Sequence, residues 1–144
     1  MVTSDVVMSG AQLKKLISRK VEPLMQEYDL RPVELDILVF LQKEKSVDTA
    51  KGIIEKKHLS KAHISKSIEN LRAGGFIQIA EDENDRRILH INLTDKSNEV
   101  IRKVNEIYTQ CKEIMERGIS KEDLEILRKV IAQVNENINR ELEE

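Results

Sequence analysis

Residues 82–94, DENDRRILHINLT, join a charged turn directly to a strand and are the clearest indication of the fold class. From position 88 to 93 every second side chain is apolar, which is typical of a strand with one buried face. These apolar positions are Leu89, Ile91 and Leu93. The preceding run 76–80, FIQIA, can pair with this strand. The sequence therefore predicts a β-hairpin with Asp82 to Arg87 as its loop.

A short helix is expected immediately before the hairpin. Ser60 is a suitable N-cap, and Gly74-Gly75 is a suitable stop, so the helix should run from about residue 60 to 73. A helix, a glycine stop and a hairpin with a cationic tip follow one another in a winged helix, which places the helix in a DNA major groove. We therefore expect a mainly α protein with a small β-hairpin wing, a winged helix-turn-helix with six helices.

The spacing of apolar residues predicts three helices before this one. The first should begin after Ser9-Gly10, and the second at Pro32, a residue suited to the first position of a helix. Asp48 is predicted to cap a short third helix. In the turn that follows, His58 would have to adopt a left-handed conformation.

Two long helices are predicted after the hairpin, the first capped by Thr94 and the second by Ser120, with Gly118 between them. Their apolar stripes are longer than the winged helix needs, so they require a partner helix. We expect that partner to be the first helix together with a second copy of the chain, the alternative being a monomeric helical hairpin. The predicted interface residues are Leu13, Leu16, Val104, Ile107, Ile114, Leu127, Ile131, Val134 and Ile138.

Composition sets further limits on the class of protein. A chain of 144 residues suits a single domain, and it has neither a secretory signal nor an apolar run long enough for a membrane span, so a cytoplasmic protein is expected. The net charge is −2, yet residues 51–72 hold six basic and two acidic side chains. This local excess is where a nucleic-acid footprint would lie. Cys111 is the one cysteine, and we expect a buried free thiol.

A helical wheel of residues 60–73 buries Ile64, Ile68 and Leu71. The opposite N-terminal face is small, polar or cationic, as a helix entering a major groove requires. The predicted DNA-binding residues of this helix are Ser60, Lys61, Ala62, His63, Ser65 and Lys66. The alternative is an ordinary amphipathic helix with solvated lysines.

The hairpin loop mixes carboxylates with two arginines. We assign Arg87 to the minor groove, Arg86 to a phosphate and Asp85 to holding Arg87 extended through a charge-assisted hydrogen bond. The alternative is a surface ion pair of little energetic worth.

The spacing of Asp85, Arg87 and then Leu93-Thr94 resembles the wing signature of the MarR family of winged-helix transcriptional regulators. Residues 60–66, SKAHISK, resemble the start of that family's recognition helix, and residues 71–77, LRAGGFI, its step into the first wing strand. The likeness spans nearly the whole chain, 1–144. It implies a winged helix-turn-helix core at 30–94 and dimerisation helices at 1–29 and 95–144.

The resemblance further implies a homodimer that binds a pseudo-palindromic operator in double-stranded DNA and represses transcription until a small-molecule effector releases it. The effector would lie between the dimerisation helices and the DNA-binding core. Candidate lining residues for this pocket are Leu16, Arg19, Tyr28 and Val104.

Little in the sequence supports another class of function. The three histidines lack the i, i+4 spacing of a helical metal site, so we expect no metal and no cofactor. No catalytic constellation stands out, and an enzyme is not expected. The alternative to a DNA-binding regulator is a winged-helix module that binds protein through its long apolar helices and has lost DNA binding.

Overall fold

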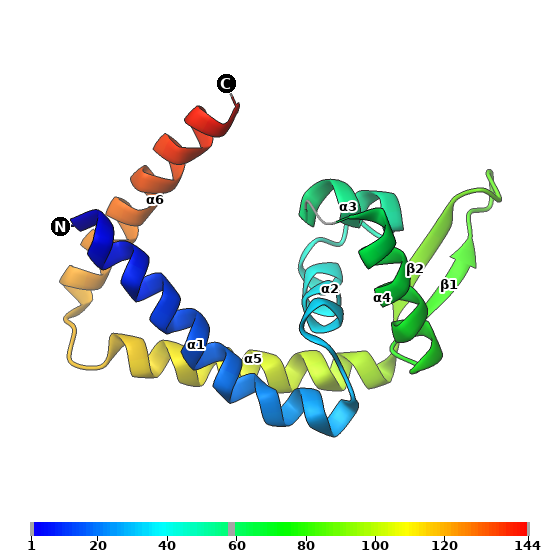
Figure 1. The fold of residues 1–144 in the computed structure, drawn as a ribbon, viewed down its shortest axis with the longest axis horizontal. Helices are drawn as coiled ribbons and strands as arrows, with labels where there is room; N and C mark the ends of the chain where they lie inside the picture. The colour runs from blue at the N-terminus through cyan, green and yellow to red at the C-terminus, as the bar shows by residue number, and fades with distance from the viewer. Residues whose placement is uncertain (1, 58–59, 144) are drawn as a thin grey trace. The chain divides into compact units, whose positions relative to one another are not determined.

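The computed structural model describes residues 2–57 and 60–143, which form two compact units, Met1–Tyr108 and Thr109–Glu144. None of the helices in these two ranges is long and apolar enough to cross a membrane. The elements are α1 (Val2–Tyr28), α2 (Pro32–Lys43), α3 (Ala50–Lys57), α4 (Lys61–Ala73), β1 (Ile77–Glu81), β2 (Leu89–Leu93), α5 (Asp95–Glu116) and α6 (Lys121–Glu143) (Figure 1).

The predicted fold class is confirmed: six helices and a two-stranded antiparallel hairpin in winged-helix order. β1 pairs with β2 in the register Ile77 to Leu93 and Ile79 to Ile91. Ile77 and Ile91 are both buried, which explains why this register is favoured over a one-residue slip that would put the apolar residues of the two strands on opposite faces. The hairpin projects beside α4 (Figure 1).

The prediction for the start of α1 was wrong, because the helix begins at Val2 and runs through Ser9-Gly10. A single glycine lowers helix stability by about 1 kcal/mol relative to alanine but does not supply a stop. Gly10 is exposed, and a Cβ there would have no neighbour within 4 Å. The additional turns expose Val6, Val7 and Met8.

A buried carboxylate at the start of α2 joins it to α4. Pro32 is the first residue of α2, as predicted, and Glu34 Oε2 accepts a hydrogen bond from the backbone N–H of Arg31 at 3.0 Å. Glu34 Oε1 accepts another from Asn70 Nδ2 of α4, also at 3.0 Å. Glu34 is only 4% exposed, so these bonds offset the loss of its hydration.

The predicted cap of α3 was also wrong. Thr49 caps this helix, because its Oγ1 accepts the N–H of Gly52 at 3.1 Å and its carbonyl accepts the N–H of Ile53 at 3.0 Å. Asp48, one residue earlier, points its side chain elsewhere and bonds His90 of β2. Threonine and aspartate are both good caps, so their order alone did not decide between them. The predicted left-handed turn residue His58 lies outside the described residues.

The buried side of α4 is the one predicted. Ile64 and Leu71 are fully buried and Ile68 is nearly so, and they pack into the core with residues of α2, α3 and the hairpin. Ser67 is also buried. The opposite side of α4 is therefore left at the surface.

The end of α4 is joined to the start of α5. Gly75 has φ +77°, which a glycine adopts without strain, and its carbonyl accepts the Thr94 hydroxyl at 2.8 Å. Lys96 Nζ donates to the carbonyl of Gly74 at 2.8 Å and lies over the ring of Phe76. Thr94 and Ser97 exchange hydrogen bonds as a cap, with the Thr94 N–H donating to Ser97 Oγ at 2.9 Å. We call these contacts the α4–α5 junction.

The second unit contains the end of α5 and all of α6. Gly118 ends α5 with φ +78°, and Ser120 caps α6 by accepting the N–H of Asp123 at 3.1 Å, as predicted. Cys111 is buried. Of the residues described in α6, none is buried. The helix exposes an apolar stripe that includes Leu127, Ile131, Val134 and Ile138.

Candidate nucleic-acid interface

The N-terminal part of α4 presents every residue predicted for the recognition helix on one exposed surface. The cap is formed as expected, with Ser60 Oγ accepting the N–H of His63 at 3.2 Å. The exposed residues are Ser60, Lys61, Ala62, His63, Ser65 and Lys66. We call this set the α4 face. Its small and polar side chains leave space for the helix to approach base edges.

Charge on the α4 face is greatest at its N-terminal end. Lys66 lies 3.9 Å from Glu69, and both are well exposed, so the glutamate offsets part of the lysine charge toward the C-terminal end. Lys61 and the helix N-terminus, which carries the positive end of the helix dipole, lie at the opposite end. The start of α4 therefore favours contact with an anionic group such as a phosphate.

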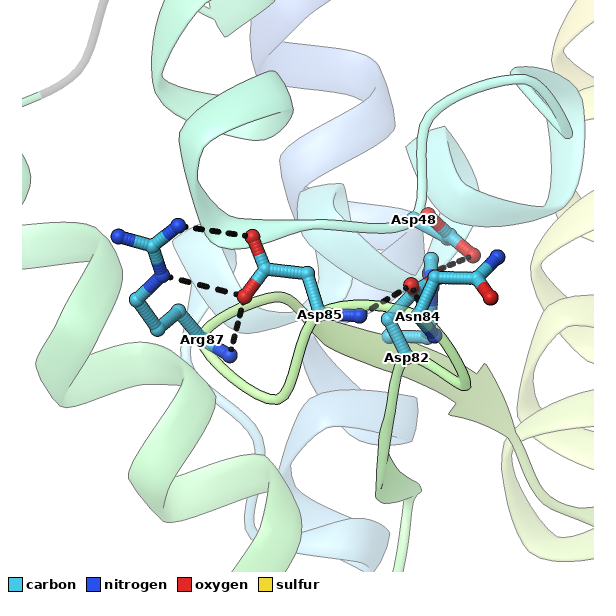
Figure 2. Close-up of polar contacts among 6 residues, drawn as sticks. Asp48, Asp82, Asn84, Asp85 and Arg87 are labelled. Carbon is cyan, nitrogen blue, oxygen red and sulfur yellow. Dashed lines mark hydrogen bonds and ion pairs between the residues drawn. The ribbon is translucent and has the colours of Figure 1, made fainter.

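Asp85 holds Arg87 as the sequence predicted. Asp85 Oδ1 accepts the Arg87 N–H at 3.0 Å and Nε at 3.1 Å, while Oδ2 accepts Nη2 at 3.2 Å (Figure 2). These hydrogen bonds lower the pKa of Asp85, the side-chain bond to Arg87 being the largest cause. The Arg87 side chain is 90% exposed. The guanidinium of Arg87 is thus restrained by Asp85 on one side and remains open to solvent on the other.

Asp82 organises the turn that carries Asp85. Its Oδ2 accepts the N–H groups of Asn84 and Asp85, both at 3.0 Å (Figure 2). Its Oδ1 is bonded to His90 Nε2 at 2.8 Å. The pKa of Asp82 is lowered by the His90 bond first and by the two backbone donors next. One carboxylate therefore joins the wing turn to the strand that follows it.

His90 of β2 bridges two carboxylates. Its Nε2 lies 2.8 Å from Asp82 Oδ1, and its Nδ1 lies 2.8 Å from Asp48 Oδ2 in the segment before α3. The backbone N–H of Ile91 also donates to the carbonyl of Asp48 at 2.6 Å. The hydrogen bonds to Asp82 and then Asp48 raise the pKa of His90. The hairpin is thereby attached to the helical core through side chain and backbone.

The sequence did not single out Asp48, Asp82 and His90 as part of this surface. Asp48 and His90 are 42 positions apart, so no local pattern links them. The contact of Asp82 with Asn84 and Asp85 did have a signal, since an aspartate that precedes a short polar turn favours hydrogen bonds to backbone two and three residues on.

A hollow of about 620 Å³ lies between α1 and α2 in the first unit. Of the residues predicted for an effector pocket, Arg19 lines it, together with Lys14, Met25 and Tyr108. Tyr28 lines a different hollow, of about 520 Å³, next to the end of α4. Val104 is fully buried in the core, and Leu16 is half-buried outside the lining of either hollow.

The predicted interface residues divide into two groups by exposure. Leu13, Leu16 and Ile107 are half-buried, whereas Val104 packs wholly inside its own chain and has no surface left for a partner. The remaining five residues are exposed, at the end of α5 and along α6, and these are Ile114, Leu127, Ile131, Val134 and Ile138.

A capped helix with a small cationic face, followed by a hairpin with a restrained arginine, defines a DNA-binding transcriptional regulator of the winged-helix type. A family described as transcriptional regulator SarA/Rot matches residues 19–104. The chain belongs to this family of transcriptional regulators. The expectation that it is not an enzyme agrees with that membership.

Individual relatives support the same conclusion. The HTH-type transcriptional regulator TcaR of Staphylococcus aureus is 26% identical over 125 residues, covering 85% of this chain and 82% of that protein. A MarR family protein from Bacillus stearothermophilus superposes with a TM-score of 0.79 at 18% identity, covering 96% and 93% of the two chains. FabT of Streptococcus pneumoniae, solved in complex with DNA, gives a TM-score of 0.77 at 19% identity and covers 96% of each chain. The predicted resemblance to the MarR family is confirmed.

Proposed function

We propose that the protein is a homodimeric repressor that binds a pseudo-palindromic operator and is released by a small-molecule effector. The observation that carries this proposal is the pairing of the exposed α4 face with Arg87, whose guanidinium is restrained by Asp85 and 90% exposed. The α4 face would occupy a major groove and Arg87 the adjacent minor groove. The solved complex of FabT with DNA supports the same use of this fold.

Two copies of the chain would place two α4 faces in successive major grooves, about 34 Å apart. The exposed apolar stripe of α6 supports dimerisation, since a soluble helix with no buried residue rarely leaves such a stripe uncovered. The second unit would therefore contribute to the dimer.

The hollow between α1 and α2 is the proposed effector site. Its volume, about 620 Å³, suits a small molecule. Three basic residues line it, Lys14, Lys15 and Arg19, against two acidic ones, Glu22 and Asp36. Because positive charge is in excess at the Lys14, Lys15 and Arg19 side, an anionic effector with an apolar body would fit its chemistry. α2 is bonded to α4 through Glu34 and Asn70, and a shift of α2 on binding would therefore act on the α4 face.

Fluorescence anisotropy with a duplex spanning the DNA upstream of its own coding sequence tests the proposal. Wild-type protein should bind with an affinity that falls as salt rises, because Lys and Arg contacts to phosphate release counterions. Arg87→Ala should weaken binding by about tenfold or more while leaving the folded state intact. Arg102→Ala is the matched control, since Arg102 is exposed on α5, outside the α4 face and the wing.

If wild-type protein shows no salt-dependent binding to any segment of that DNA, the proposal fails and the protein-binding alternative gains support. Equal losses in Arg87→Ala and Arg102→Ala would instead indicate a general charge effect and contradict the assigned role of the wing.

A further inference from the structure

The bridge formed by His90 has a chemical requirement. A neutral imidazole has one N–H, so it donates to one partner and accepts at its other nitrogen. Both partners of His90 are carboxylates, Asp82 and Asp48, each 2.8 Å away. Only the protonated ring donates to both at once. The two 2.8 Å distances therefore fit an imidazolium between two anions.

This bridge is the first part of a continuous chain of contacts that ends at the wing tip. Asp82 receives His90 on one oxygen and the N–H groups of Asn84 and Asp85 on the other. Asp85 in turn receives the backbone N–H, Nε and Nη2 of Arg87. The orientation of Arg87 thus depends on a turn that is held at its other end by His90.

We propose that His90 is the positioning residue of the wing: its protonated ring fixes the wing turn to the segment before α3, so that DNA binding weakens when the ring loses its proton. The inference rests on the proposed DNA-binding function and adds to it a pH dependence located at one residue. His90 acts on Arg87 through Asp82 and Asp85 and is not itself proposed as a DNA contact.

The direction of the pH effect follows from the groups that face the ring. Among the described residues, Asp82 from the wing turn and Asp48 from the segment before α3 act on it electrostatically, and Ala80, opposite on β1, is uncharged. Both anions favour the charged ring and raise the pKa of His90. The stabilisation is therefore complete below the ordinary pKa of histidine and is lost as the pH rises through the raised value.

His90→Gln and Asp48→Asn are the informative variants. Glutamine carries no charge at any pH, and asparagine keeps the backbone carbonyl that accepts the N–H of Ile91. The affinity of wild-type protein for its upstream DNA should fall about three- to tenfold more between about pH 6 and pH 9 than that of His90→Gln. Because His58 and His63 remain in both proteins, the difference between the two pH profiles isolates His90.

NMR of the free protein supplies a readout that needs no DNA. The ring nitrogens of His90 should titrate above the ordinary histidine pKa, and the midpoint should move down in Asp48→Asn. Backbone amides of residues 83–87 should become more mobile as wild-type His90 deprotonates, and should be mobile at every pH in His90→Gln.

Parallel pH profiles of DNA binding in wild type and His90→Gln would overturn the inference, as would an ordinary titration midpoint for the ring. A merely structural role would lower affinity equally at every pH. If wild-type protein binds no DNA at any pH, the proposed function fails, and the NMR titration still decides whether His90 restrains the wing.

Discussion

At the scale of single residues, two carboxylates with different surroundings have different tasks. Asp85 is close to solvent and restrains an arginine that is itself exposed, so it adds little to the stability of the fold. Glu34 is buried and depends on two donors, one of them in another helix. Loss of the contact between Asp85 and Arg87 should therefore alter DNA binding. Loss of a donor to Glu34 should instead lower the stability of the fold.

Asp85→Asn should lower the affinity for DNA about three- to tenfold, because the neutral amide restrains Arg87 less well. The unfolding midpoint should stay unchanged, as both groups are at the surface. Glu83→Gln, which removes the same charge from the same turn, is the control for net charge. Loss of affinity in both variants to the same extent would contradict the restraining role of Asp85.

Asn70→Ala should destabilise the protein by about 1–3 kcal/mol, since it leaves a buried oxygen of Glu34 without its donor. Urea unfolding followed by circular dichroism measures this loss. Asn98→Ala, on the exposed side of α5, should change stability by less than about 0.5 kcal/mol. An equally small change in Asn70→Ala would show that the hydrogen bond between α2 and α4 contributes nothing.

Among the helices and strands, the start of α3 shows how the choice of capping residue determines what the neighbouring residue does. Thr49 satisfies the N–H of Gly52, which frees Asp48 to reach the hairpin. Had Asp48 capped the helix, His90 would have lost one of its two acceptors. The short helix and the wing are thus linked by the choice of cap.

Thr49→Ala should therefore lower the free energy of unfolding by about 0.5–2 kcal/mol, the usual loss for a removed N-cap. Thr49→Ser keeps the hydroxyl, so it should retain most of the stability that Thr49→Ala loses. Thermal unfolding of the three proteins makes the comparison. If Thr49→Ala were as stable as the wild type, Thr49 would not be the cap of α3, and Asp48 would be the better candidate.

Much of this organisation could be predicted from the sequence because its signals are local. Ser60, Gly75, Thr94, Gly118 and Ser120 mark element ends by their own chemistry, and the structure agrees with each. The Asp85 and Arg87 contact is also local, spanning two positions. These signals account for nearly all of the fold.

What the sequence did not reveal depends on contacts across long separations or on competition between equal choices. The bridge between Asp48 and His90 spans 42 positions and appears only once the hairpin packs on the core. The start of α1 was misplaced because a glycine in an exposed helix interior is unfavourable but tolerated. The burial of Val104 within its own chain depended on packing that the apolar stripe alone did not specify.

Across the whole molecule, the two units differ in where their apolar residues lie. Residues of the first unit form the core, with Ile37, Leu38 and Ile53 fully or almost fully buried. In the second unit, none of the described residues of α6 is fully buried, and the helix exposes an apolar stripe. An apolar stripe of this kind on one helix is typical of a surface that is covered by association.

The double variant Leu127→Glu/Val134→Glu should convert a dimer into a monomer, because it puts two charges into the apolar stripe of α6. Sedimentation equilibrium measures the change. Ala132→Glu, on the opposite side of α6, adds charge without touching the stripe and should leave the dimer intact. A wild-type protein that is monomeric at micromolar concentration would contradict the proposed dimer.

The α4–α5 junction has a consequence for how the protein opens locally. Thr94 and Lys96 bind the carbonyls of Gly75 and Gly74, so the end of α4 cannot fray unless the first turn of α5 releases it. Amide protons on both sides of the junction should then exchange with solvent in a single cooperative event. The hairpin lies between these two ends in sequence, so its base stays fixed even when the contacts of His90 with Asp82 and Asp48 are released and its tip moves.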